Sequence, residues 1–263
     1  MKVLESGLYT GKIVDRLNKN GIYINTVHYS LDGDFTGSHY HLNPHICFLL
    51  QGADKEKRRN QVYQRKGGDI FFYYSGEEHE TVQVNHFMKS MVIELDTSFL
   101  KKYDLAESQL ELALEKNNHL KFTMLKTLKE FQNPDNSNAI LSIQMLVLNL
   151  YSLSVSKKKA PEWLLKVEEL LQDKWNETIT LDDLATVANI HPVTISKYFA
   201  KFHKETLSEY IRKIKVEHSL SLIKNSNQSL TEVAHYCGFA DQSHFIRCFK
   251  NATGYLPKDF RKL

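Results

Sequence analysis

Cysteine is scarce in this chain of 263 residues, and its three copies show no paired spacing. The positions of Cys47, Cys237 and Cys248 exclude a disulfide framework and fit a reducing, cytoplasmic location. A long apolar run is missing too. The N-terminus has no signal-peptide core, and residues 139–155, the most apolar segment, are interrupted by serine, glutamine and asparagine. We therefore expect neither secretion nor a membrane span.

A large net charge is also absent, because the formal charge is only +3. The charge is unevenly distributed, however. Residues 161–190 carry two basic against seven acidic side chains, whereas residues 191–262 carry twelve basic against six acidic ones. A basic surface concentrated in one segment is what contact with nucleic-acid phosphates requires, because each neutralised phosphate releases bound counterions.

The segment patterns predict a multidomain α and β fold. Residues 1–96 contain short β-branched and aromatic runs between turn residues, which is typical of an all-β sandwich or small barrel. Apolar residues recur at helical spacing over 97–155, and the last of these helices needs burial against its own sheet or a second copy. The polar, Pro-containing stretch 156–162 is predicted to be a linker, followed by an all-α domain over 163–263.

A repeat lies within that all-α domain, because residues 181–202 and 230–251 share one pattern. Each copy has a capping box, then a small residue that lets two helices cross closely. Asn189 or Gly238 follows, the two residue types that most easily adopt a positive φ. A helix starter and a closing phenylalanine, Phe199 or Phe249, complete the unit. This pattern predicts two helix-turn-helix units joined by one long helix over residues 206–225.

The second helix of each unit is predicted to present one polar face to DNA. At 100° per residue Phe199 and Phe249 point inward, so another set of side chains points away. Arg and Gln on such a face suit bidentate contacts with base edges in the major groove. Lysines beside it, including Lys204 and Lys213, suit phosphate contacts. The predicted DNA-binding residues are Val193, Thr194, Ser196, Lys197, Lys201, Gln242, Ser243, Ile246, Arg247 and Lys250.

The tandem "LATVANIHPVTISKYF", "LSEYIRKIKVEHSLSLI" and "LTEVAHYCGFADQSHFIRCFKNATGYLPKDFRK" resembles the DNA-binding domain of AraC/XylS-type transcription regulators. The resemblance covers residues 163–262 and implies two recognition helices in successive major grooves. It also implies promoter DNA and RNA polymerase as partners, activation as the usual mode, and a homodimer formed through the helices of 97–155. One departure is Lys204, which stands where the family has Gly after the first recognition helix, so a different local turn is predicted there.

The first segment with chemical character is "GDFTGSHYHLNPHICFLLQG", residues 33–52, which holds three histidines. Its spacing G-x5-H-x-H-x3-H-x6-G, and the later G-x5-Y-x-G-x2-H-x3-Q over residues 68–83, are similar to the two motifs of the cupin barrel. The resemblance implies a sensor barrel in which a small-molecule effector binds. The expected effector pocket consists of His39, His41, His45, Tyr74 and His79.

These histidines have two open interpretations. A His-x-His pair on a strand places both rings on one side of the sheet, as a shared metal requires. His39, His41, His45 and His79 then suit Zn²⁺, Ni²⁺, Cu²⁺ or Fe²⁺, with His45 where metal-bearing cupins have Glu. Alternatively, the same residues serve a pocket without metal as hydrogen-bonding or packed polar groups. No cofactor is established by the sequence.

Two function classes compete for the whole chain. One is a ligand-responsive transcription regulator, in which the barrel senses the ligand and the helical domain binds DNA. The other is a metal-dependent cupin enzyme, an oxygenase or isomerase with a helical accessory domain. Tandem recognition units have no role in an enzyme, so we predict the regulator, and no catalytic residues.

Overall fold

The computed structural model describes residues 2–30, 37–84, 87–115, 117, 119–133, 139–154 and 160–263. The chain divides into two compact units, residues 1–156 and 157–263. Gly33 of the first cupin-like motif and most of the predicted linker 156–162 lie outside the described residues. Within the described ranges, no helix combines the length and the apolar character needed to cross a membrane.

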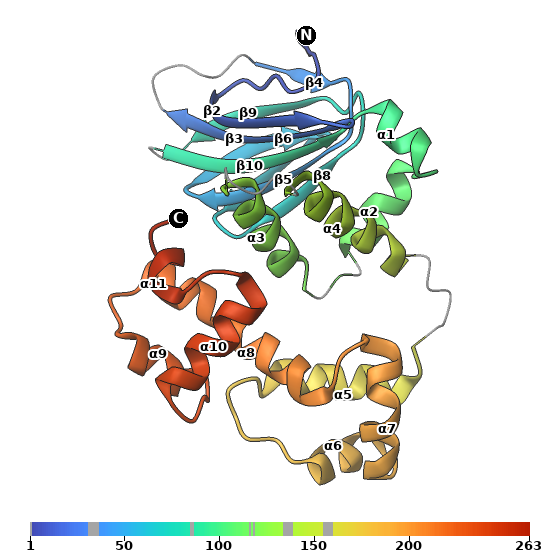
Figure 1. Cartoon of the computed structure of the whole chain (residues 1–263), viewed down its shortest axis with the longest axis vertical. Coiled ribbons are helices and arrows are strands. Elements are labelled where there is room, and N and C mark those ends of the chain that lie inside the picture. Colours follow the sequence, from blue (N-terminus) through green and yellow to red (C-terminus); the bar gives the residue numbers. More distant parts are fainter. Residues whose placement is uncertain are drawn as a thin grey trace. The chain divides into compact units, whose positions relative to one another are not determined.

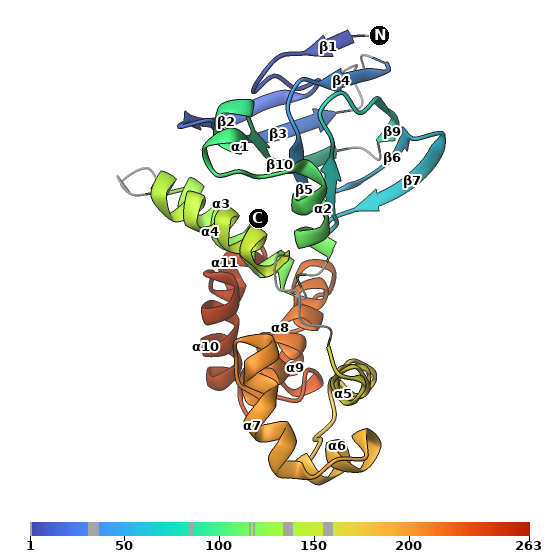
Figure 2. The same ribbon diagram turned by 90° about the vertical axis from the view of Figure 1, so that its right-hand side faces the viewer.

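The N-terminal unit contains two five-stranded sheets that face each other (Figure 1 and Figure 2). Side chains of both sheets, among them His39, Arg65, Cys47 and Tyr73, line one internal cavity. One sheet has the order β1 (Lys2–Leu4), β4 (His39–His41), β9 (His79–Val84), β6 (Ala53–Arg58) and β7 (Gln61–Lys66). The other has the order β2 (Lys12–Lys19), β3 (Ile22–Ser30), β10 (Phe87–Leu95), β5 (His45–Gln51) and β8 (Ile70–Tyr73).

Helices follow the strands in this unit, as the sequence predicts. They are α1 (Thr97–Lys102), α2 (Glu107–Glu115), α3 (Leu120–Phe131) and α4 (Ala139–Ser154). The apolar helix α4 packs against α2 and α3, with Ile143 and Val147 buried, while Leu141 and Met145 remain exposed. Packing within the chain therefore covers one face of α4, and dimerisation through residues 97–155 stays a prediction.

The C-terminal unit is entirely helical in its described residues, 160–263. Its helices are α5 (Glu162–Asp173), α6 (Leu181–Ala188), α7 (Pro192–His203), α8 (Leu207–Asn225), α9 (Leu230–Tyr236), α10 (Gln242–Thr253) and α11 (Pro257–Phe260). Helices α6 and α7 form the first helix-turn-helix unit, and α9 and α10 form the second. The long helix α8 packs against α7, α9 and α10 and joins the two units.

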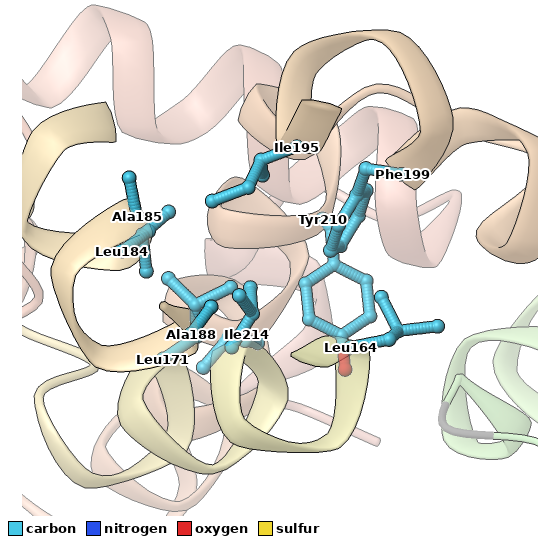
Figure 3. Close-up of a cluster of buried hydrophobic side chains, with 10 residues drawn as sticks. Leu164, Leu171, Leu184, Ala185, Ala188, Ile195, Phe199, Tyr210 and Ile214 are labelled. Atoms are coloured by element: carbon cyan, nitrogen blue, oxygen red, sulfur yellow. The ribbon is translucent and has the colours of Figure 1, made fainter. Parts of the chain in front are cut away.

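Local sequence signals account for the boundaries of these helices. Thr180, Thr206 and Ser229 each form a capping box with the acidic residue three positions later, which confirms the three predicted helix starts. The turns contain Asn189 with φ 52° and Gly238 with φ 69°, both left-handed as predicted. Figure 3 shows the core that these helices enclose in the first unit, where Ile195 and Phe199 are fully buried.

The predicted different turn at Lys204 is wrong. Lys204 has φ 61° and ψ 18°, and its N–H donates to the carbonyl of Ala200. Gly254 after α10 has φ 84°, and its N–H donates to the carbonyl of Lys250 in the same way. Helices α7 and α10 therefore end in the same left-handed cap, although lysine is poorly suited to that backbone conformation.

Candidate nucleic-acid interface and a buried histidine cluster

Helix α7 has one buried face and one exposed face. Ile195 and Phe199 lie in the core, whereas Val193 is 58% exposed and Ser196 and Lys197 are also exposed. Thr194 is half-buried and Lys201 exposed, so none of the five residues predicted for DNA contact in this unit lies in the core. The helix begins at Pro192 after an N-cap that the sequence analysis missed: Nδ1 of His191 accepts a hydrogen bond of 3.2 Å from the N–H of Val193.

Helix α10 follows the same plan. Phe245 and Phe249 are fully buried, and Asp241 caps the helix by accepting from the N–H of His244 at 2.7 Å. Ser243, Arg247 and Lys250 are exposed and Ile246 is half-buried, as the periodicity predicts. Gln242 is half-buried, and its side-chain oxygen accepts a 2.8 Å hydrogen bond from the hydroxyl of Thr231. This bond fixes the Gln242 amide at the start of the helix.

The lysines beside the two helices are held differently. The ammonium of Lys201 lies 4.4 Å from the ring centroid of Tyr198, a cation–π contact that positions it on α7. Lys213 on α8, predicted as a phosphate contact, forms an ion pair of 2.6 Å with Glu205. This carboxylate competes with a phosphate for Lys213, which makes Lys201 and Lys250 the stronger candidates.

Strand pairing brings the histidines of the two cupin-like motifs together. His39 on β4 and His79 on β9 are directly opposite each other in the sheet, and His41 lies two residues along the same face. One side-chain nitrogen from each of these three buried residues lies within 4.8 Å of the others. The sequence predicts this juxtaposition of His39, His41 and His79.

Backbone hydrogen bonds fix the tautomers of two of these rings. Nδ1 of His39 lies 3.0 Å from the carbonyl oxygen of Gly37, and Nδ1 of His79 lies 2.9 Å from that of Glu77. A carbonyl only accepts, so each Nδ1 donates and each Nε2 of the neutral ring keeps its lone pair. Nδ1 of His41 is buried with no hydrogen-bond partner. Such an arrangement of neutral imidazoles, two of them oriented by backbone carbonyls, suits a transition-metal ion.

The environment keeps these rings neutral. Burial lowers the pKa of His39, His41, His45 and His79, because desolvation disfavours the charged imidazolium. The pKa of His41 falls to about 3, with neighbouring His79 and His39 adding to the effect of burial. Neutral imidazole is the form that coordinates a metal, so burial prepares the cluster for binding.

His45 and Tyr74 are placed differently from the other predicted pocket residues. The ring of His45 stacks on Tyr73, with centroids 4.5 Å apart and an interplanar angle of 5°, and it lies outside the three-histidine group. Tyr73, the last residue of β8, lines the cavity, whereas Tyr74 lies beyond the end of the strand and does not line it. The Tyr74 hydroxyl instead donates to Glu111 of α2, so its prediction as a pocket residue is wrong.

A buried ionic network that the sequence analysis missed lies behind the histidines. The Arg65 guanidinium forms ion pairs with Asp54 and Glu56, and the Tyr73 hydroxyl donates to Glu56 at 2.8 Å. All four side chains are buried, and Tyr73 connects them to His45. The cavity enclosed by the network and the histidines has a volume of about 30 Å³. It has room for an ion or a water molecule.

Comparison with known proteins gives a family match at the C-terminal end. Residues 184–263 match a family model described as a helix-turn-helix domain. The bifunctional transcriptional activator/DNA repair enzyme AdaA of Bacillus subtilis is 29% identical over 102 residues, which cover 39% of this chain and 48% of AdaA. The transcriptional regulator GbdR of Pseudomonas aeruginosa is 30% identical over 97 residues, covering 37% of this chain and 26% of GbdR. The chain thus spans less than half the length of these two relatives.

Two further similarities extend over most of the chain. The transcriptional activator RhaS of Pectobacterium carotovorum is 23% identical over 245 residues, covering 85% of this chain and 86% of RhaS. The structure of ToxT from Vibrio cholerae matches 92% of this chain and 98% of that chain, with 15% identity and a TM-score of 0.39. Residues 184–263 therefore carry a helix-turn-helix domain, and the chain is similar to AraC/XylS-type transcription regulators.

Proposed function

We propose that this chain is a sequence-specific DNA-binding transcription regulator. The observation that carries the proposal is the pair of helix-turn-helix units, whose second helices each bury phenylalanine and expose polar or basic residues. Phe199 and Phe249 hold the two helices in the core, while Lys197 and Arg247 face outward. Binding of two such helices to one DNA molecule requires half-sites about one helical turn apart.

Within this proposal the exposed residues divide into two roles. Arg247 offers a planar, bidentate donor pair suited to guanine, and Val193 offers an apolar contact suited to a thymine methyl group. Lys201 and Lys250 suit phosphate contacts that fix the register without reading sequence. Activation, contact with RNA polymerase and dimerisation remain predictions from the family resemblance.

The N-terminal unit is the proposed sensor, and a divalent transition-metal ion is its proposed effector. His39, His41 and His79 would hold the ion, which would place a fixed positive charge between the two sheets. A cavity of about 30 Å³ fits an ion, whereas an organic effector of more than a few atoms would need the sheets to separate. The only neighbouring carboxylate among the cavity-lining residues described is Glu56, already engaged by Arg65 and Tyr73, which argues against the enzyme alternative.

Selection of bound DNA from a genomic library tests the DNA-binding proposal. We expect the purified full-length protein to enrich a small set of sites that share two half-sites. The selection is run on protein treated with a chelator and on protein supplied with Zn²⁺. Absence of any enriched site in both samples would contradict the proposed function.

Metal binding is tested separately by titration with Zn²⁺ and Ni²⁺ under calorimetric detection. We expect one ion per chain in the native protein and a loss of about 10-fold or more in affinity for His41→Asn. His28→Asn is the matched control, because His28 lies on β3 outside the three-histidine group and contacts Phe87. Equal metal affinity in the native protein and in His41→Asn, both with unchanged thermal unfolding, would exclude this site.

A further inference from the structure

The turn between α5 and α6 contacts the second helix-turn-helix unit, although it precedes the first one in the chain. The indole ring of Trp175 stacks on His218 of α8, with ring centroids 3.9 Å apart and an interplanar angle of 8°. The same ring lies 5.9 Å from the ring of Tyr236 at the end of α9. Trp175 therefore connects the α5–α6 turn to the joining helix α8 and to α9 of the second unit.

The turn of the second unit lies against the same segment. Gly238 has φ 69°, and a Cβ at this position would lie 2.6 Å from the backbone oxygen of Asn176. The ammonium of Lys215 on α8 donates a 2.9 Å hydrogen bond to the carbonyl of Gly238. Only glycine permits both the left-handed turn and this close approach of two backbones.

Helix α8 also packs against helices of both units, α7 in the first and α9 and α10 in the second. The hydrophobic core shown in Figure 3 consists of buried residues between 164 and 214, and it includes no residue of α9 or α10. Beneath the α5–α6 turn lies a cavity of about 210 Å³, lined by Ile211, Ile214 and Trp175 among others. Trp175 packs against the edge of this core and also stacks on His218, so its ring contacts both the first unit and α8.

We infer that Trp175, Asn176, His218 and Gly238 form an interunit brace that fixes the angle between α7 and α10. Because the two recognition helices are proposed to enter successive major grooves, that angle sets which spacing between half-sites is accepted. Trp175 is then a positioning residue that determines specificity without touching DNA. The brace itself is inferred from the contacts of the α5–α6 turn alone. Its effect on half-site spacing rests on the proposed DNA-binding function.

A DNA-independent measurement tests the brace directly. Spin labels are attached at Ser196→Cys on α7 and Ser243→Cys on α10, both exposed, in a full-length Cys248→Ser background. We expect one narrow distance distribution in the protein with native Trp175, and a broadened one in Trp175→Ala and His218→Ala. Trp175→Phe, which keeps an aromatic stack, should restore the narrow distribution. An unchanged distribution in both alanine variants would overturn the inference whatever the protein binds.

The functional consequence is tested with operators recovered by selection, in which the half-site spacing is altered by one or two base pairs. We expect the native protein to discriminate sharply between spacings. Trp175→Ala should lose about 2- to 10-fold in affinity for the original spacing and discriminate less between spacings. Leu165→Ala, an exposed apolar residue of α5, is the control and should behave as native. Unchanged spacing preference in Trp175→Ala would contradict the brace, whereas failure of native protein to bind any site would contradict the proposed function instead.

Discussion

Lys204 adopts a backbone conformation that glycine adopts more readily. Its φ of 61° lies in the left-handed region, which costs an L-residue about 1–2 kcal/mol. Lys204→Gly should therefore raise the free energy of unfolding of the C-terminal unit, by about 1 kcal/mol after the greater freedom of glycine in the unfolded chain is subtracted. Urea unfolding followed by tryptophan fluorescence measures this, because Trp163 and Trp175 are the chain's two tryptophans and both lie in that unit.

Asn189→Gly is the matched control for the Lys204 variant. Asn189 has φ 52°, but asparagine tolerates the left-handed region far better than lysine does. Its replacement should change the free energy of unfolding by a few tenths of a kcal/mol at most. A gain in stability for Asn189→Gly equal to that for Lys204→Gly would show that the left-handed strain at Lys204 is not the cause.

We expect acid to lower the stability of the N-terminal unit, because its clustered histidines are buried as neutral rings. His41 has a pKa of about 3 in the folded state, below the value of about 6.5 in the unfolded chain. As the pH falls, the unfolded state therefore binds a proton at this position before the folded state does. The contribution of neutral His41 to the free energy of unfolding is complete above pH 6.5 and is lost as the pH falls toward 3. In chelator-treated protein, lowering the pH from 7 to 5 should reduce the free energy of unfolding by about 2 kcal/mol through His41 alone.

Urea unfolding followed by far-ultraviolet circular dichroism at the two pH values measures this effect. The His41→Asn variant removes the titrating group, so the difference between pH 7 and pH 5 should shrink in that variant. His28→Asn should shrink the difference by less than His41→Asn, because burial also lowers the pKa of His28 but its ring is only half-buried. A native-like pH dependence in His41→Asn would contradict the assignment.

At the residue scale, motif spacing predicts which histidines meet but not what surrounds them. His39, His41 and His79 converge because strand alternation and one strand pairing bring them together. Choosing Tyr74 instead of Tyr73 for the pocket is an error of one residue, because β8 ends at Tyr73 and Tyr74 beyond it donates to Glu111. Arg65 gave no signal in the sequence, because a charged residue in a polar strand is ordinarily exposed and its burial depends on two partners distant in sequence.

At the scale of elements, the exposed face of α10 gives a prediction about DNA affinity. Arg247 is exposed on the face opposite to Phe245 and Phe249, so its replacement leaves the core intact. Arg247→Ala should weaken binding to a selected operator by about 1–3 kcal/mol and relax specificity at one base pair, with little change on random DNA. Fluorescence anisotropy titrations with operator and scrambled duplexes measure both quantities.

Lys166→Ala is the control for the Arg247 variant, because Lys166 lies on α5 and pairs with Glu162. It removes one positive charge from the same unit without altering α10, and operator affinity should stay close to native. If Arg247→Ala and Lys166→Ala weaken binding equally on operator and random DNA, Arg247 contributes charge and not base recognition.

Elements with strong local signals could be predicted, and elements without them could not. Capping boxes at Thr180, Thr206 and Ser229 act over three residues, so the sequence alone specifies these helix starts. Strand β6, with the sequence "ADKEKR", looks like a charged loop. It is a strand because Asp54 and Glu56 face inward to Arg65, and only the tertiary structure provides that partner.

At the scale of the whole molecule, composition and repeats predict a β-rich part followed by helical segments, and the structure confirms that order. The charge asymmetry between residues 161–190 and 191–262 also places the basic side chains in the unit that carries both recognition helices. How binding in one unit affects the other is a property of the complete chain. Sequence motifs do not predict this coupling, because the coupling depends on the free-energy difference between conformations of the intact protein.

Thermodynamic linkage makes that coupling testable without knowledge of its structural route. If Zn²⁺ bound at His39, His41 and His79 changes operator affinity, the operator must change Zn²⁺ affinity by the same factor, typically about 5- to 150-fold. Titrations of operator with and without Zn²⁺, and of Zn²⁺ with and without operator, measure the two factors independently. Equal factors in native protein, and the loss of both in His41→Asn, would establish metal-dependent regulation. Coupling factors that persist in His41→Asn would mean that the metal acts elsewhere, and two factors of one would mean that the histidine cluster does not regulate DNA binding.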